Sequence, residues 1–571
     1  MERLISAAIL LLILLPVKSQ VGKQDSELKR EITLYNPYKP SLPDVRKKSF
    51  LPDINDTSKI NLSVSYDIRP NKYSPVYSLT PIKPAALLPD PLPKLYKGYV
   101  NIGVGTYTTP LAEISITNER SKSGALGLYA RHYSSQGRVL LQNNERVFAG
   151  LMDNEAAIFG KRFFRDSYIK GSADFMQNTR YAYGYKPEII GYDPSKKENK
   201  LVYNDLGANL SFASLNLDST EFSYDFEIGW NMFRTTKDFT QHHGGLKGEM
   251  AKLFRGFYIG SGISYDHYKL PSALLDKPRF IFSATPFVSK NKEQWNFKLG
   301  AEIMLERDAE YSTRVHLYPD VNFGFSVVPD YIRFFTGLGG KLERNLPERV
   351  ITENPFLVPD GSLFLLPNTD HAIVVFAGLR GNNGIGGNYV ISASYSMLND
   401  MLTFSNIVFP DTAMRTERGN YFIPVTDEAE ILNIHGEING AITGKVSFHA
   451  SGNYNKYTLS ASSHPWNKPP WDAKIGVNYN LRNKIIAGAE ITALGRRKLM
   501  VSESPTGWQT LAPSIMEMPA HVNLNLSAEY RYTKILSFWA RINNVSWNRY
   551  LEWSYYPAQR FLIMAGFTYS L

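Results

Sequence analysis

The amino-acid sequence predicts an all-β protein that folds into an antiparallel transmembrane β-barrel. Three features indicate this fold: segments of 9 to 12 residues in which apolar and polar residues alternate, an aromatic content of 13%, and one more alternating segment at the C-terminus. A period of two is typical of a β-strand, because successive side chains point to opposite faces of a sheet.

Four segments show the alternation most clearly, and they are residues 222–232, 295–305, 473–481 and 522–532. Tilted strands of this length match the thickness of a membrane, whereas strands of soluble proteins usually have about five or six residues. A soluble sandwich or propeller is the alternative, but it would leave long unpaired strand edges that a closed barrel removes. We therefore predict a barrel whose apolar face contacts lipid and whose polar face lines the lumen.

The composition argues against several other classes of protein. The chain of 571 residues contains no cysteine, which excludes disulfides and thiolate-bound metals. The net charge of +10 comes from dispersed basic residues and not from one basic segment, so we expect no nucleic-acid partner. No recognisable catalytic pattern accompanies the ten histidines, and we predict no enzymatic activity, no metal site and no cofactor.

The first nineteen residues have the features of a secretory signal peptide. Arg3 precedes an apolar run over residues 5–15, and small residues at the end of the segment predict cleavage between Ser19 and Gln20. The run is too short to span a bilayer as a helix. The sequence thus predicts export, with an outer-membrane location in a Gram-negative bacterium.

Residues 20–94 differ in composition from the rest of the chain. They contain eleven of the 33 prolines, which disfavour helices and interior strands. We predict an extended N-terminal arm here, followed by the barrel over residues 95–571. One short strand-forming segment within the arm is a candidate for binding TonB or another partner: Glu31, Ile32, Thr33, Leu34 and Tyr35.

The C-terminal segment carries an apolar side chain at every second position up to the last residue. These positions are Phe561, Ile563, Ala565, Phe567, Tyr569 and Leu571. The pattern resembles the terminal-strand signal by which outer-membrane barrels are recognised for insertion. This resemblance implies the barrel-assembly machinery as a partner, although the usual last residue is phenylalanine and not leucine.

Two further stretches resemble the barrel of TonB-dependent receptors. Residues 536–550 are similar to the closing hairpin of that family, with an alternating strand, an Asn-Asn element and an aromatic loop, and residues 353–381 are similar to its barrel segments. The resemblance implies a 22-stranded barrel over roughly residues 96–571. The chain departs from the family in its N-terminal region, because residues 20–94 are too few and too rich in proline for the usual plug.

The strand number also follows from the length of the barrel region. At roughly 22 residues for each strand with its connection, the region holds about 20 to 22 strands, and bacterial barrels have even numbers. We predict 22 strands, with 16 to 18 as the alternative if long loops take up more of the chain.

Charged residues on the polar faces of the predicted strands are candidates for lining the lumen. They are Glu221, Asp225, Glu227, Lys298, Glu302, Glu529 and Arg531. His242 and His243 precede two glycines, and we interpret them as surface residues of a hairpin turn and not as metal ligands, because neighbours in a strand point to opposite faces.

Three functions are compatible with these features. The favoured one is a barrel that moves a polar solute across the outer membrane, with a separate plug, TonB or a lipoprotein as candidate partner. The second is an accessory subunit of an assembly or secretion complex that docks through its arm. The third is an adhesive barrel whose external loops bind partners. In each case outer-membrane lipid and lipopolysaccharide would surround the protein.

Overall fold

The computed structural model describes residues 96–571 with short gaps. The gaps are residues 119–120, 122, 187–198, 216–221, 237–238, 272–278, 308–311, 358–360, 385, 409–419, 504–511, 547–548 and 560. The described residues all belong to one compact unit, Pro91–Leu571. The predicted cleavage site at Ser19 and Gln20, the arm with Glu31–Tyr35, and Glu221 lie outside the described residues.

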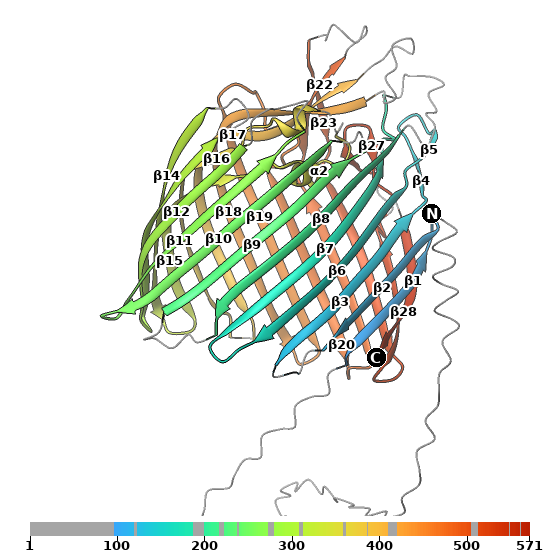
Figure 1. The fold of residues 1–571 in the computed structure, drawn as a ribbon. Coiled ribbons are helices and arrows are strands. Elements are labelled where there is room, and N and C mark those ends of the chain that lie inside the picture. The colour runs from blue at the N-terminus through green and yellow to red at the C-terminus, as the bar shows by residue number, and fades with distance from the viewer. Residues whose placement is uncertain are drawn as a thin grey trace, which may run out of the picture. The chain divides into compact units, whose positions relative to one another are not determined.

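In the described part of the chain, 22 antiparallel strands close into a barrel (Figure 1). The last strand, β28 (Leu562–Ser570), pairs with the first, β1 (Gly98–Gly105). Closure leaves no sheet edge within the barrel wall, which confirms the prediction of a barrel and not a sandwich. The strand count confirms the prediction of 22 strands and not 16 to 18. The remaining strands of the wall are β2 (Thr109–Thr117), β3 (Gly124–Ser135), β6 (Leu151–Phe163), β7 (Ser167–Tyr181), β8 (Lys200–Ser214), β9 (Phe222–Thr235), β10 (Thr240–Phe254), β11 (Phe257–Lys269), β12 (Arg279–Asn291), β13 (Trp295–Arg307), β14 (Thr313–Val328), β15 (Ile332–Glu343), β16 (Thr369–Asn382), β17 (Asn388–Val408), β18 (Asn420–Thr443), β19 (Val446–Leu459), β20 (Trp471–Leu481), β21 (Ile485–Leu494), β24 (His521–Arg531) and β25 (Leu536–Asn543).

The four clearest alternating segments correspond to strands β9, β13, β20 and β24. The prediction for His242 and His243 was wrong, because both lie within β10 and not in a turn. Consecutive strand residues face opposite sides, so one histidine faces outwards and the other inwards. The glycines that follow are tolerated inside this strand because both of its sides are paired, with β9 and with β11.

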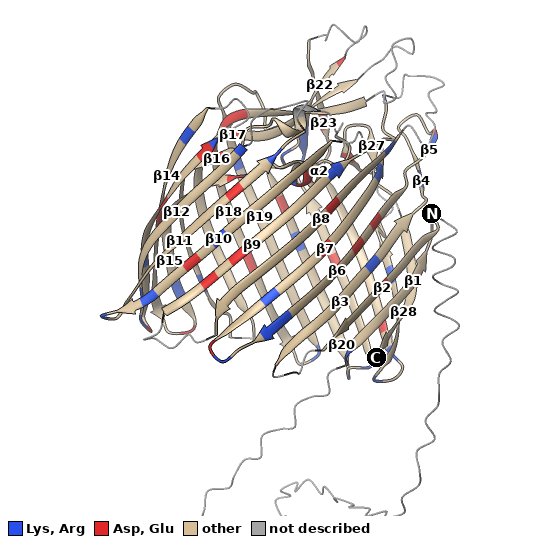
Figure 2. Ribbon diagram, viewed as in Figure 1, with Lys and Arg blue, Asp and Glu red and all other residues tan. Residues whose placement is uncertain are grey.

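The two faces of the wall differ in polarity as expected for a membrane barrel. Large apolar side chains such as Ile228, Leu246 and Leu317 are at least half exposed, and they alternate with polar positions on the same strands. Lysine, arginine, aspartate and glutamate also occur along the strands well away from the rims (Figure 2). Most of these charged side chains therefore point to the lumen, since the alternating apolar ones occupy the outer face.

The two ends of the barrel carry connections of very different length. At one end the connections are tight turns, such as residues 255–256 and 444–445. At the other end lie longer connections, including residues 344–368 and 544–561. In outer-membrane barrels short turns face the periplasm and long loops face outwards. Both ends of the described chain meet at the tight-turn end, where the Lys97 amide donates to the Leu571 carbonyl over 2.9 Å.

A small sheet extends the wall beyond the long-loop end (Figure 1). β17 and β18 are the longest strands described, with 21 and 24 residues. The upper part of β17 pairs in parallel with β22 (Arg497–Glu503), which in turn pairs with β23 (Ser514–Met518). Two short hairpins also lie in the long connections, β4 (Arg138–Leu140) with β5 (Arg146–Phe148), and β26 (Leu551–Trp553) with β27 (Tyr556–Pro557).

Helical structure is minor in the described residues. The α-helix α2 (Pro347–Glu353) and the 3₁₀ turn η1 (Gly361–Phe364) both belong to the connection between β15 and β16. Among the described residues, no helix is long and apolar enough to cross a bilayer.

Candidate functional site: a capped lumen

The long-loop mouth of the barrel is filled by two of its own connections. We call the described residues of these connections, within 344–368 and 544–561, the cap. The first contains α2 and η1, and the second contains the β26–β27 hairpin. Figure 1 shows α2 and β27 within the mouth, among the upper ends of the strands.

The cap has a hydrophobic core that reaches across the mouth. One cluster of buried side chains joins the cap to Tyr203 and Phe233 on β8 and β9 and to Phe404 and Phe422 on β17 and β18. Seven wall strands, β10 to β16, separate β9 from β17. The cap members of this cluster are Val350, Ile351, Phe356, Leu357, Leu363, Phe364, Leu366, Trp553 and Tyr556. A dry core that spans nearly opposite walls closes this part of the mouth to solute.

Aromatic rings form the centre of this core. The Tyr556 side chain is fully buried and stacks on Phe356 with ring centroids 3.8 Å apart. Trp553 packs edge-on against Phe404 and Phe422 at 5.3 and 5.1 Å. These contacts connect the two halves of the cap to each other and to the wall.

Arginine side chains of the wall and of the small sheet hold the cap backbone in place. Arg279 of β12 donates to the Phe364 and Leu366 carbonyls at 3.2 and 3.1 Å. Arg497 of β22 donates to the Glu552 and Leu551 carbonyls at 2.9 and 2.8 Å. Guanidinium groups thus satisfy buried carbonyls that the irregular cap backbone would otherwise leave unpaired.

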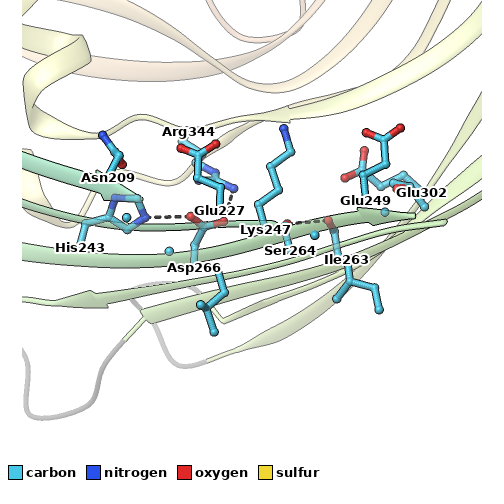
Figure 3. A pocket seen from close by; sticks show the side chains of 17 residues that line it. Asn209, Glu227, His243, Lys247, Glu249, Ile263, Ser264, Asp266, Glu302 and Arg344 are labelled. Carbon is cyan, nitrogen blue, oxygen red and sulfur yellow. Dashed lines mark hydrogen bonds and ion pairs between the residues drawn. The ribbon is translucent and has the colours of Figure 1, made fainter. Parts of the chain in front are cut away.

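A polar cavity of about 500 Å³ lies on the inner wall next to the cap (Figure 3). Its acidic lining residues are Glu227, Glu249, Asp266 and Glu302, and its basic ones are Lys247 and Arg344. Arg344 forms an ion pair with Asp266, and Asp266 also contacts His243 Nε2 at 2.8 Å. Because Arg344 begins the cap and Asp266 belongs to β11, this pair attaches the base of the cap to the wall.

The other acidic groups of the cavity are less engaged. Among the described residues, no ion pair involves the carboxylates of Glu227, Glu249 or Glu302. Figure 3 shows Glu227, Lys247 and Glu249 projecting from the wall on one side and Ile263 on the other. The cavity therefore presents an excess of carboxylate oxygens to whatever occupies it, which favours cationic and hydrogen-bonding groups.

The sequence-predicted lumen residues fall into separate places. Glu227 and Glu302 line the cavity beside the cap, and Asp225 lies opposite Glu249 in the register of β9 and β10. Glu529 and Arg531 line a second cavity of about 690 Å³ at the tight-turn end. The last of them, Lys298, forms an ion pair of 2.6 Å with Asp320. The structure thus brings two of the predicted residues together with His243, Lys247, Glu249, Asp266 and Arg344, which sequence reasoning did not select.

The cap was also missed in the sequence, although a signal was present. Residues 353–357 resemble barrel segments in sequence but lie in the cap, whereas β16 does belong to the wall. Residues 363–366 are four consecutive apolar residues in a long connection. An external loop exposed to water would not carry such a run, so it indicates burial.

Glu348 on α2 connects the cap to the cavity electrostatically. Burial and the charge of Asp205 raise the pKa of the Glu348 carboxyl, and His243 opposes this shift. Its Oε2 atom is buried without a hydrogen-bond partner among the described residues. The ionised form of Glu348 is therefore costly in the closed cap.

We expect cap closure to weaken as the pH rises. A carboxyl with a raised pKa binds its proton more tightly in the closed cap than in the open one. The stabilisation of the closed cap that results is fully present below the usual pKa near 4.5 and is lost as the pH rises through the raised pKa. The Glu348→Gln variant should close more firmly at neutral pH and lose this pH dependence. Hydrogen exchange of the α2 amides, corrected for intrinsic rates between about pH 5 and about pH 7.5, measures both effects.

Glu353→Gln on the same helix is the matched control. This change removes the ion pair of Glu353 with Lys468, so it should speed exchange at both pH values and keep the pH dependence. Equal pH dependence in wild type and Glu348→Gln would contradict the role of Glu348.

No group of three or more histidine, aspartate or glutamate side chains suited to a metal ion occurs in the described ranges.

No protein-family model matches the chain, and no curated protein sequence matches it either. Solved structures do match. The FrpB iron transporter from Neisseria meningitidis superposes with a TM-score of 0.62 at 11% identity, covering 84% of this chain and 82% of that one.

Two further receptors match a similar share of the chain. The ferripyoverdine receptor of the outer membrane of Pseudomonas aeruginosa has a TM-score of 0.58 at 12% identity, with 83% of this chain and 72% of that one covered. The siderophore receptor PiuA from Acinetobacter baumannii has a TM-score of 0.58 at 11% identity, with 84% and 82% covered. The fold is that of TonB-dependent outer-membrane receptors. The predicted resemblance is thereby confirmed for the 22-stranded barrel.

Proposed function

We propose that this protein is an outer-membrane transport barrel that admits a polar solute when its cap opens. The observation that carries the proposal is the polar cavity directly beside a cap with its own hydrophobic core. Receptors and transporters with the same barrel fold support transport over catalysis. Glu227, Glu249 and Glu302, which form no ion pair with another described residue, favour a solute with cationic or hydrogen-bond-donating groups.

The partners of this barrel belong to the same proposal. TonB, a separate plug or a lipoprotein would act at the tight-turn end, and Glu31–Tyr35 is the candidate segment for such contact. Export through cleavage after Ser19 and insertion through the segment ending in Tyr569 and Leu571 are likewise proposed. In the structure this C-terminal segment forms β28, which pairs with both β1 and β25.

Single-channel conductance of the purified chain in planar bilayers tests the proposal. The wild type should be closed for most of the time, because the cap fills the mouth. A variant with residues 347–366 replaced by a short Gly-Ser linker should conduct steadily and prefer cations over anions. Adding Glu249→Gln and Glu302→Gln should move the permeability ratio toward one, since both carboxylates line the cavity.

The control for charge selectivity is Glu517→Gln. Glu517 lies on β23, outside the barrel wall, so this change should leave the permeability ratio of the linker variant unchanged. A linker variant that is folded, as judged by heat-modifiable gel mobility, yet never conducts would overturn the transport proposal. That outcome would favour an accessory subunit that docks through residues 20–94.

A further inference from the structure

The outer face of strands β8 to β11 carries an unusual distribution of charge. The exposed apolar side chains occupy even-numbered positions on β8 to β10, such as Leu210, Ile228 and Leu246, and odd-numbered positions on β11, such as Ile263. By this alternation all acidic residues of the four described strands face the lumen. They are Asp205, Asp225, Glu227, Glu249 and Asp266.

The basic residues of the same strands are distributed in the opposite way. Lys247 faces the lumen and lines the inner cavity, whereas the other basic positions fall on the outward side. These outward residues are Lys200, Arg234, Lys252 and Lys269. The outer face of this part of the barrel is therefore basic and, within the described strands, carries no carboxylate.

A row of polar side chains on the outer face of β3, β6, β7 and β8 leads up to Arg234 on β9. His132 contacts Asn154 at 2.6 Å, Asn154 donates to Gln177 at 3.0 Å, and Gln177 donates to Asn204 at 2.8 Å. Arg234 lies directly opposite Asn204 in the register of β8 and β9. These side chains alternate along their strands with residues that make ion pairs or core contacts on the lumen side, so they face outwards. The lumen-side residues are Arg131, Asp153, Arg180 and Tyr203.

The position of the row along the strands indicates its depth in the membrane. Ten residues separate Asn204 from Ser214 at the tight-turn end of β8. At about 3.3 Å per residue and a tilt of about 40°, this is about 25 Å, which is the height of the apolar band of such barrels. The polar row and Arg234 therefore lie where the headgroups of the outer leaflet begin.

An apolar groove of about 500 Å³ lies on the outer face just below this level. Its floor is Gly244, which lies opposite both Trp230 on β9 and His267 on β11, and a Cβ atom built on Gly244 meets nothing within 4 Å. Trp230, Leu246 and Tyr265 form apolar walls that are between one third and just over one half exposed. One register step higher, His242 lies opposite Lys269.

We propose that this groove and the basic residues above it bind a phosphorylated glycolipid of the outer leaflet. An acyl chain would lie over Gly244 between Trp230 and Tyr265. The phosphate would contact Arg234 and Lys269, and the amide row would bond to sugar hydroxyls. The basic outward positions favour an anionic head, and the apolar groove directly below favours acyl chains on the same molecule.

Native mass spectrometry of the full chain in detergent, titrated with phosphorylated lipid A, tests this proposal. Arg234→Gln with Lys269→Gln should weaken binding by roughly fivefold per basic side chain, and so by about 25-fold together. Gly244→Leu, which fills the groove, should weaken it by about fourfold for each methylene displaced. Inorganic phosphate alone and an uncharged glycolipid of equal chain length should bind much more weakly than lipid A.

Gly436→Leu is the matched control for the groove variant. Gly436 lies in β18 on an outward position, and a Cβ atom there also meets nothing within 4 Å. This variant should bind lipid A as the wild type does, and heat-modifiable mobility should show all variants folded. Unchanged binding in folded Gly244→Leu, or equal binding of the uncharged glycolipid, would overturn the proposal. Neither outcome bears on transport, which the conductance experiment tests separately.

Discussion

Replacing Tyr556 with alanine should release the cap while leaving the barrel closed. The Tyr556 side chain is fully buried at the centre of the cap core, and its ring stacks on Phe356. Loss of a large buried aromatic side chain costs about 3 to 5 kcal/mol. Because the barrel strands pair independently of this ring, the cost should fall on cap closure.

Hydrogen exchange of residues 347–357 measures this effect directly. A loss of about 3 to 5 kcal/mol corresponds to exchange that is faster by about two to four orders of magnitude. Single-channel records of the same variant should show frequent openings that the wild type lacks. Amides of β7 and β8 should exchange as slowly as in the wild type.

The control is Tyr454→Ala on β19. This tyrosine is half exposed and alternates with inward residues, so its loss should not change cap exchange. If Tyr556→Ala left cap exchange unchanged, the cap core could not be what holds the mouth closed.

The second large effect, on barrel assembly, is expected at the seam of the barrel, where the last strand β28 pairs with the first strand β1. Gly566 lies directly opposite Gly103 where β28 pairs with β1. A Cβ atom on Gly566 would lie 2.2 Å from the Ile102 carbonyl oxygen and 2.5 Å from the Trp539 ring. Neither the paired backbone nor the ring can give way easily, because Trp539 is buried and donates to Asn101 over 2.8 Å.

Gly566→Val should therefore prevent the last strand from closing the barrel. The folded, heat-modifiable band in outer-membrane fractions should be lost or strongly reduced, and the unfolded chain should be degraded. Gly436→Val, at an equally interior strand position with open space around it, should fold normally. A stable folded band for Gly566→Val would contradict this prediction and would show that β28 can pair with β1 in a different register.

The success of the sequence prediction for the wall has a simple physical basis. In strands such as β9 and β24, lipid on one side and the lumen on the other impose alternation on every residue, so the pattern is local and readable. The same local rule misled the interpretation of His242 and His243. Two glycines after two histidines are typical of a turn, but here both neighbouring strands pair with β10 through those positions.

The cap and the outer groove could not be predicted in this way. Phe356, Leu363 and Tyr556 show no strand period, and their partners Phe233 and Phe404 lie on strands far away in sequence. The groove likewise depends on register, because only the pairing of β9, β10 and β11 places Gly244 between Trp230 and His267.

Alternation and chain length were enough to predict a barrel with a polar lumen and about 20 to 22 strands, and closure of β28 onto β1 selected 22 over the alternative of 16 to 18. The tertiary structure alone decided that the loops fill the mouth, that acidic groups gather beside the cap and that basic ones face outwards at headgroup depth. These features arise from contacts between strands far apart in the chain, and no local pattern of residues specifies such contacts.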